Sequence, residues 1–254
     1  MDATSISEIM TVTSSSGVET AFTRNQYYLI YNLFSLVVAG MFGAFVYFLL
    51  NVNQVAKQYR NAVVVSAVVV GIAGYHYLRI FTGWSDFEFN EGYRYADWLI
   101  TVPLLLVELV IVLGIATNKR RPLMIQLTVA AILMIALGYP GENSTSNSTK
   151  WIFFALSMIP FLFILFKVVN EVKSALPSQS PRAAAALKIA LGLLLVTWFV
   201  YPIAYLFPVI WPDSTVSEVV RQAGYSIADL LAKPVYGLAI LAVAKVKSDS
   251  SANA

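Results

Sequence analysis

Residues 94–108 read RYADWLITVPLLLVE, and they place three ionisable side chains in one of the most apolar regions of the chain. Arg94 and Asp97 lie near the start of this stretch, and Glu108 ends it. A charged side chain inside a membrane is costly, so such residues usually face the interior of a helix bundle and mark a pathway for protons, ions or ligands. The stretch therefore predicts a functional site inside a membrane bundle.

The composition of the whole chain agrees with a membrane protein. Its 254 residues are 58% hydrophobic and only 12% charged. A helix that crosses the hydrocarbon core needs about 20 mostly apolar residues, and runs of that length recur along the chain. We predict an all-α fold, a bundle of seven transmembrane helices, with spans at residues 26–50, 61–83, 92–115, 122–140, 151–173, 184–209 and 217–245.

The predicted spans leave no room for a soluble domain. We predict an external N-terminal tail over residues 1–25, one membrane domain over residues 26–246 and a cytoplasmic tail over residues 247–254. The chain has no cysteine and one histidine, which excludes disulfides, thiolate metal sites and a histidine metal cluster. The basic residues are not gathered on one folded surface, so the expected partner is the lipid bilayer and not a nucleic acid.

Lysine and arginine residues gather in the loops and chain end that the spans place on one side of the membrane. That side carries Lys57, Arg60, Lys119, Arg120, Arg121, Lys167, Lys173, Arg182, Lys188, Lys245 and Lys247. The other side carries Arg24, Arg79, Lys150 and Arg221, mixed with Asp86, Glu88, Glu142, Asp213 and Glu218. The positive-inside rule therefore places the N-terminus outside and the C-terminus in the cytoplasm.

Helix geometry places the polar residues of the third span on one stripe. Asp97 follows Arg94 by three residues, and Thr101 follows Asp97 by four. Glu108 lies eleven residues beyond Asp97, which is close to three full turns. The two acids are then separated by about 16 Å along the helix axis, roughly half the thickness of the hydrocarbon core.

A second pair of charged residues lies in the last span, where Asp229 and Lys233 are four apart and share a face. The neutral amine of a buried lysine readily forms a Schiff base with an aldehyde. A protonated Schiff base needs counter-ions, and Asp97 and Asp229 are the available carboxylates, with Arg94 placed to keep both ionised. The alternative is that these charged groups form structural ion pairs, or that Arg94 and Glu108 only extend to the two membrane surfaces.

Aromatic residues at helical spacing occur at the depth of these charges. Trp198, Tyr201 and Tyr205 are spaced by three and four residues, and Trp98 follows Asp97. Met134 and Gly138 lie one turn apart in the fourth span. Aromatic residues with this spacing are often ordinary core, but a pocket lined by them beside a reactive lysine would suit a long polyene.

These segments resemble microbial rhodopsins, specifically the proteorhodopsin and xanthorhodopsin group of bacterial light-driven proton pumps. RYADWLITVPLLLVE is similar to their third helix, WFVYPIAY to the wall of their sixth and SIADLLAKPVYGL to their seventh. GYHYLR in the second span supplies the histidine that this group pairs with its counter-ion. The resemblance extends over all seven predicted spans.

The resemblance implies a role for each charged residue near the lysine. Lys233 would hold all-trans retinal as a Schiff base. Asp97 would be the primary counter-ion and proton acceptor, and Asp229 the second counter-ion. Arg94 would orient both carboxylates, and His76 would hydrogen-bond to Asp97.

The resemblance also implies which residues complete the proton path and which line the retinal pocket. Glu108 would be the cytoplasmic proton donor, protonated at rest in its apolar surroundings, with Thr101 between acceptor and donor. Asp, Thr and Glu at these three positions are typical of proton pumps, whereas sodium pumps of the family carry Asn, Asp and Gln. The pocket would be lined by Trp98, Leu105, Met134, Gly138, Trp198, Tyr201, Pro202 and Tyr205, and an apolar residue at the position of Leu105 goes with green absorption.

Two residues depart from the pattern of that group. Pro234 directly follows the lysine, and because it lacks a backbone N–H it is expected to loosen the helix there. Phe154 stands where xanthorhodopsin has a glycine that admits a carotenoid antenna, so its ring argues against such an antenna.

The implied function is an outward light-driven proton pump and not an enzyme. The protein is expected in the inner membrane of a bacterial cell. It is expected to assemble as a homo-oligomer, either a trimer or a pentamer. Light would isomerise retinal, the proton would pass to Asp97 and then outward, and Glu108 would supply the replacement. The alternative is a sensory rhodopsin that signals to a transducer and would not need Glu108. A retinal-free receptor or carrier is disfavoured by an internal Lys233 with two acids.

Overall fold

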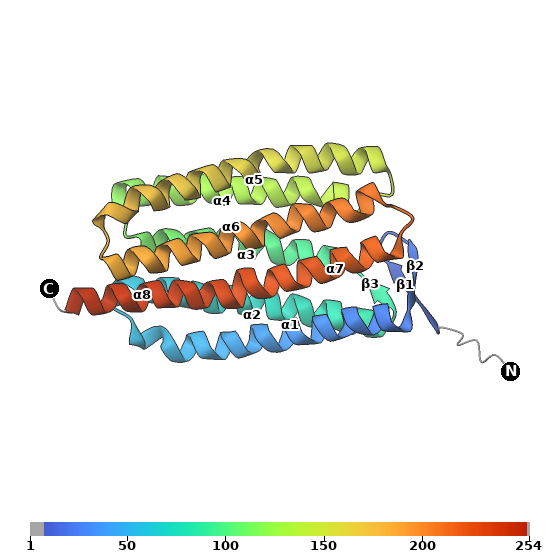
Figure 1. Cartoon of the computed structure of the whole chain (residues 1–254), viewed down its shortest axis with the longest axis horizontal. Helices are drawn as coiled ribbons and strands as arrows, with labels where there is room; N and C mark the ends of the chain where they lie inside the picture. The colour runs from blue at the N-terminus through green and yellow to red at the C-terminus, as the bar shows by residue number, and fades with distance from the viewer. Residues whose placement is uncertain (1–7, 253–254) are drawn as a thin grey trace.

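A computed structural model describes residues 8–252, and these residues contain seven helices long and apolar enough to cross a membrane, as predicted. The helices run side by side as one elongated bundle (Figure 1). Six of them are α1 (Arg24–Asn51), α2 (Lys57–Ser85), α3 (Gly92–Leu113), α4 (Thr117–Glu142), α5 (Asn147–Ala175) and α6 (Pro181–Ile210). The seventh consists of α7 (Thr215–Leu230), the π-helical turn η3 (Leu231–Val235) and α8 (Tyr236–Ala252).

Most helices extend beyond the predicted spans because their ends are polar. The fifth, predicted from residue 151, begins at Asn147, where the Ser146 hydroxyl accepts a hydrogen bond from the Thr149 amide and caps the helix. Short 3-10 turns, η1 (Val52–Gln54) and η2 (Leu176–Ser178), follow α1 and α5. The seventh helix continues to Ala252, so residues 247–252 of the predicted cytoplasmic tail are helical, and residues 253–254 lie outside the described part of the chain.

A small sheet at one end of the bundle was not predicted. β1 (Ile9–Ser14) pairs antiparallel with β2 (Glu19–Thr23) and parallel with β3 (Glu88–Phe89). The region predicted as a polar tail thus forms a hairpin from residue 9 onward, while residues 1–7 lie outside the description. The strands alternate in burial, with Val12 and Phe22 buried, and the Phe22 ring lies 5.3 Å from that of Trp84 on α2. This alternation is the period of a strand with one covered face.

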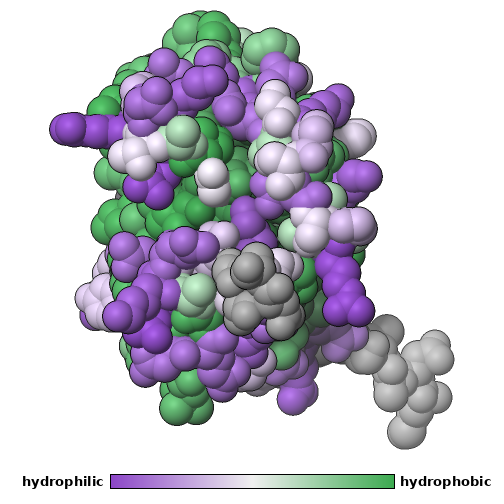
Figure 2. Space-filling model, turned by 90° about the vertical axis from the view of Figure 1, so that its left-hand side faces the viewer, coloured by the Kyte–Doolittle hydropathy of each residue, from purple (hydrophilic) through white to green (hydrophobic). Residues whose placement is uncertain are grey.

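The bundle turns apolar side chains outward, as expected for contact with lipid. Leu50, Ile159 and Val196 are 72%, 68% and 69% exposed. Figure 2 looks onto the end of the bundle at which α8 ends, where hydrophilic residues form a broken rim and hydrophobic residues appear between them and at the sides. The most enclosed helices are α3 and the seventh, in which 61% of the most apolar window is buried, against 22% in α1 and α5. These two helices carry the predicted site.

Gly237 on α8 lies where the helices leave no room for a side chain. A Cβ at this position would lie 2.6 Å from the Phe48 ring and 3.3 Å from the Ser66 Cβ. We predict that Gly237→Ala lowers the free energy of unfolding by about 1–3 kcal/mol, because the added methyl displaces the ring. The measurement is the midpoint of thermal unfolding in detergent, followed by circular dichroism.

Gly43→Ala is the matched control, because a Cβ at Gly43 on α1 would meet nothing within 4 Å. Alanine is the better helix former, so this change should leave the midpoint unchanged or raise it. Equal midpoints for the two variants would contradict the packing at Gly237.

Candidate functional site

The centre of the site is the ammonium group of Lys233, held between two carboxylates. Lys233 Nζ donates to Asp97 Oδ2 on α3 at 2.7 Å and to Asp229 Oδ1 on α7 at 2.6 Å. Each of the three side chains is at most 1% exposed. Two carboxylates and one ammonium in this space carry one excess negative charge, which has to be balanced by hydrogen bonds or by further cations.

The two carboxylates differ in how completely they are hydrogen-bonded. Asp229 accepts from the hydroxyls of Tyr77 and Tyr201, each at 2.7 Å, and from the Trp98 indole N–H at 3.1 Å. Asp97 has the lysine, but its Oδ1 finds no partner within residues 8–252. Thr101 donates to the backbone carbonyl of Asp97 at 2.9 Å. Asp229 therefore has donors on both oxygens, whereas Asp97 has one oxygen without a hydrogen-bond partner among the described residues.

Lys233 lies in a π-helical turn whose cause is local. Pro234 has no backbone N–H, so the carbonyl four residues before it loses its usual donor. In the π turn the Tyr236 amide donates to the Leu231 carbonyl, five residues back, and to the Lys233 carbonyl. The loosening expected from Pro234 thus takes the form of a widened turn, and the helix continues without interruption.

Arg94 is buried near the site without contacting either aspartate directly, and its role in orienting them stays a prediction. Its guanidinium donates to Glu91 at 2.8 Å and to the Gln222 amide oxygen at 2.9 Å, and makes no hydrogen bond or ion pair with either aspartate at the lysine. It also lies over the Tyr225 ring, 5.1 Å from its centroid.

The expected hydrogen bond between His76 and Asp97 is also not formed. His76 Nδ1 is buried without a partner in the described part of the chain, as is the Asp97 Oδ1 atom. The imidazole ring packs edge-on against Tyr75, with 5.2 Å between ring centroids. The other oxygen of the Asp97 carboxylate accepts from the Lys233 ammonium at 2.7 Å.

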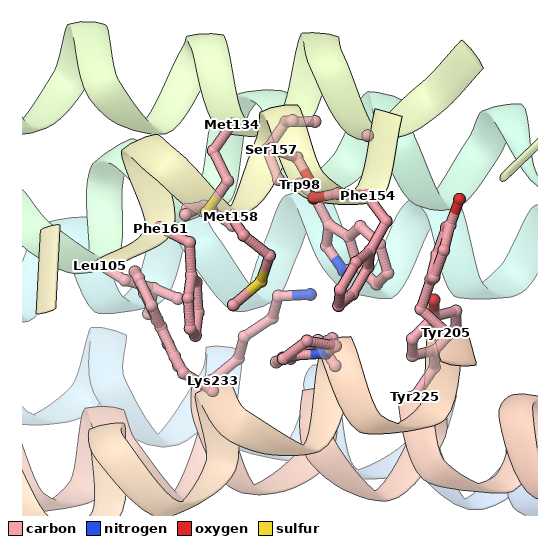
Figure 3. A pocket seen from close by; sticks show the side chains of 16 residues that line it. Trp98, Leu105, Met134, Phe154, Ser157, Met158, Phe161, Tyr205, Tyr225 and Lys233 are labelled. Atoms are coloured by element: carbon pink, nitrogen blue, oxygen red, sulfur yellow. Dashed lines mark hydrogen bonds between the residues drawn. The ribbon is translucent and has the colours of Figure 1, made fainter. Parts of the chain in front are cut away.

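A cavity opens beside the lysine, and Figure 3 shows the Lys233 side chain reaching into it between Met158 and Trp98. All eight predicted pocket residues line it together with Lys233. Its further lining residues are Val102, Ile135, Phe154, Ser157, Met158, Phe161 and Tyr225. Apart from the amine and a few hydroxyls the walls are apolar and aromatic. Such a cavity suits an elongated apolar molecule with a group that reacts with an amine.

The α5 wall of this cavity was missed in the sequence, although a pattern was present. Phe154, Ser157, Met158 and Phe161 follow the spacing of one helix face. The Phe154 ring stacks on Tyr205 with 5.4 Å between centroids. Because the rest of α5 is equally apolar, its sequence does not distinguish the face toward the cavity from the face toward lipid.

Glu108 is the buried acid at the other end of α3. It is fully buried, and its Oε2 lies 2.5 Å from the Ser66 hydroxyl on α2. The same hydroxyl lies 3.2 Å from the Ala62 carbonyl oxygen, which can only accept. Ser66 has one proton, so both contacts are satisfied when Glu108 is protonated and donates to Ser66 while Ser66 donates to Ala62. Ser66 was not found in the sequence analysis.

A second cluster of buried charges lies toward the sheet. Arg221 on α7 contacts Glu142 at 2.9 Å, Glu218 at 2.8 Å and Glu91 at 3.2 Å. Gln222 bonds to Glu91 at 3.0 Å, which links this cluster to Arg94. Glu142, Glu218 and Arg221 were expected among the charges of the external loops, but they lie on helix ends that share a cavity with the sheet and neighbouring loops.

A polar cavity of about 420 Å³ joins this cluster to the sheet and the adjacent loops. Glu91, Glu142, Glu218 and Arg221 line it on the bundle side, and β1 and β2 line it on the other. The cluster is therefore the polar connection between the buried arginine on α3 and this end of the molecule.

Residues 29–246 match the model of the bacteriorhodopsin-like protein family, which is most of the chain. The chain belongs to this family. The resemblance to microbial type 1 rhodopsins drawn from the third, sixth and seventh helices is thereby confirmed.

Individual rhodopsins agree with the family assignment. The chain is 30% identical over 221 residues to the green-light absorbing proteorhodopsin of Gamma-proteobacterium EBAC31A08, covering 86% of this chain and 87% of that protein. The crystallographic structure of xanthorhodopsin, a light-driven ion pump with dual chromophore, is 43% identical with a TM-score of 0.86. A thermophilic rhodopsin is 41% identical with the same TM-score, and each of the two alignments covers 96% of this chain and 99% of the other.

Arg221 holds the buried acids of this rhodopsin together at the sheet end. We predict that Arg221→Met lowers the free energy of unfolding by about 3–5 kcal/mol, because buried carboxylates are left without their cation. The measurement is thermal unfolding by circular dichroism. Arg79→Met is the control, since Arg79 is exposed and bonds only the Tyr93 hydroxyl among the contacts described. Equal losses in the two variants would show that the cluster does not depend on Arg221.

Proposed function

We propose that this rhodopsin is a light-driven outward proton pump that uses all-trans retinal bound to Lys233. The observation that carries the proposal is the chain of buried acids along α3. Asp97, with one free oxygen, contacts the Lys233 ammonium, and Glu108 lies on the same helix in a separate apolar environment. The similarity to a proteorhodopsin and to a structure titled a light-driven ion pump supports it.

The residues around Lys233 fit retinal. The amine can condense with the aldehyde, with loss of water, and the aromatic walls from α3, α5 and α6 can hold the polyene. Trp98 and Tyr201 pack edge to face with 5.2 Å between centroids and form one rigid part of that wall. Bound there, retinal supplies a light-driven isomerisation that loosens the proton on the Lys233 nitrogen.

Asp97 accepts the proton because its environment leaves it room to do so. The Lys233 nitrogen lies 2.7 Å from Asp97 Oδ2, a distance for direct transfer. Asp229 lies as near, but three donors besides the lysine stabilise its charge, so it remains the anion that balances the site. Arg94 acts from further away and faces the cluster that leads outward.

Glu108 returns a proton to the Lys233 nitrogen. It is buried without a cation, and its contacts with Ser66 are satisfied by the protonated acid. A neutral carboxyl at rest is what a donor requires, whereas the acceptor has to be ionised. The two acids on α3 thus take opposite roles because one faces an ammonium and the other does not.

The direction of transport follows from the proposed orientation. The end with the sheet would face outward, and the end at which α8 ends would face the cytoplasm, in accord with the excess of basic residues there. We place the protein in the inner membrane of a bacterium and expect a trimer or a pentamer. Asp97 is then nearer the outside and Glu108 nearer the cytoplasm, as outward pumping requires.

We propose one chromophore only, with green absorption. The Phe154 ring forms part of the cavity wall and stacks on Tyr205, where an antenna would need an opening. Leu105 lines the cavity as an apolar residue, which agrees with the green-absorbing members of the group.

Lys233→Ala should give a protein with no visible absorption band after addition of all-trans retinal, because no other lysine lines the cavity. The measurement is an absorption spectrum of the purified protein, with circular dichroism to verify folding. Lys167→Ala, outside the cavity, should keep the band. A visible band in Lys233→Ala would show that the chromophore is attached elsewhere.

Glu108→Gln should slow the return of the proton to the Lys233 nitrogen by about a hundredfold or more, the usual effect of losing a proton donor. The rate should then rise as pH falls, because protons have to come from bulk water. Flash spectroscopy measures this rate, and Glu171→Gln, outside the described site, is the control. A rate in Glu108→Gln that is unchanged and independent of pH would make Glu108 a bystander and favour the sensory alternative.

A further inference from the structure

Two buried polar atoms, one on the proposed donor and one on α8, have no hydrogen-bond partner among residues 8–252. They are the hydroxyl of Tyr236 and the Oε1 atom of Glu108. We propose that Tyr236 is a positioning residue for the donor, and that its hydroxyl bonds Glu108 Oε1 directly or through one water. The inference rests on the proposed role of Glu108 and deepens it.

The helices bring these two residues to the same level of the bundle. Tyr236 begins α8, three residues after Lys233, and is 1% exposed. A Cβ built on the adjacent Gly237 would lie 3.3 Å from the Ser66 Cβ, and Ser66 bonds Glu108. The start of α8 therefore packs against the part of α2 that holds the donor.

The surroundings give the Tyr236 hydroxyl few other partners. Leu105, Leu106 and Leu109 are each at most 2% exposed and make this part of α3 apolar. A hydroxyl buried there without a partner is unfavourable, and buried tyrosines usually pair their hydroxyl. Ser66 already serves Glu108 Oε2, which leaves Oε1 as the unpaired acceptor of the donor group. Pairing the two atoms satisfies both.

The pairing has a consequence for proton transfer. When Glu108 is protonated at the oxygen beside Ser66, Oε1 is its carbonyl oxygen and accepts from Tyr236. When the proton has left for the Lys233 nitrogen, the carboxylate has two hydroxyl donors, Ser66 and Tyr236. Hydrogen bonds to an anion are stronger than those to a neutral acid. Tyr236 keeps its own proton and lowers the free energy of the state in which Glu108 has given up its proton.

Tyr236→Phe tests the proposal, because it removes the hydroxyl and keeps the ring. In the light-minus-dark infrared spectrum, the C=O band of Glu108 is identified as the band absent in Glu108→Gln. In Tyr236→Phe it should move to higher wavenumber, because the carbonyl loses a donor. The proton should return to the Lys233 nitrogen about fivefold more slowly, which corresponds to about 1 kcal/mol.

Tyr59→Phe is the matched control, since Tyr59 is a buried tyrosine on α2 and its ring packs near Lys247. It should change neither the band nor the rate. An unshifted band in Tyr236→Phe, or a return of the proton that is unchanged or faster, would overturn the role of Tyr236. That result is distinct from failure of the pump mechanism, which is shown by Glu108→Gln alone.

Discussion

The ammonium of Lys233, held between Asp97 and Asp229, is the interaction on which the structure of this rhodopsin depends. Charges inside a membrane are tolerated only where they face the interior and find partners. This requirement turns the polar faces of α3 and the seventh helix inward and makes them the most enclosed helices of the bundle. The apolar faces of the other helices are then left for the lipid and for the aromatic walls of the cavity.

The same chemical group takes three different roles here because its surroundings differ. Asp229 accepts from four donors, whereas Asp97 contacts the lysine and its Oδ1 atom has no partner among the described residues. Glu108 has no cation beside it, and Ser66 is its partner. The proposed proton route rests on this difference, because hydrogen bonds and nearby charges set which carboxyl group is more easily ionised.

The sequence predicts well what depends on position along one helix. The stripe on α3, the pair on the seventh helix and the aromatic spacing on α6 follow from helical periodicity, and all predicted pocket residues line one cavity. It predicts poorly what depends on packing between helices. The partner of Glu108 comes from α2, the direct partners of Arg94 are Glu91 and Gln222, and the hairpin before α1 lies in a segment whose polarity resembles a tail.

The most direct test of the account is the direction of proton movement in the light. Cells that carry the protein with all-trans retinal are illuminated in unbuffered medium while external pH is recorded. The account predicts acidification that reverses in the dark, disappears with a protonophore and is absent in Asp97→Asn, which removes the acceptor. External alkalinisation, or no change in pH from cells whose protein has its visible band, would contradict outward pumping.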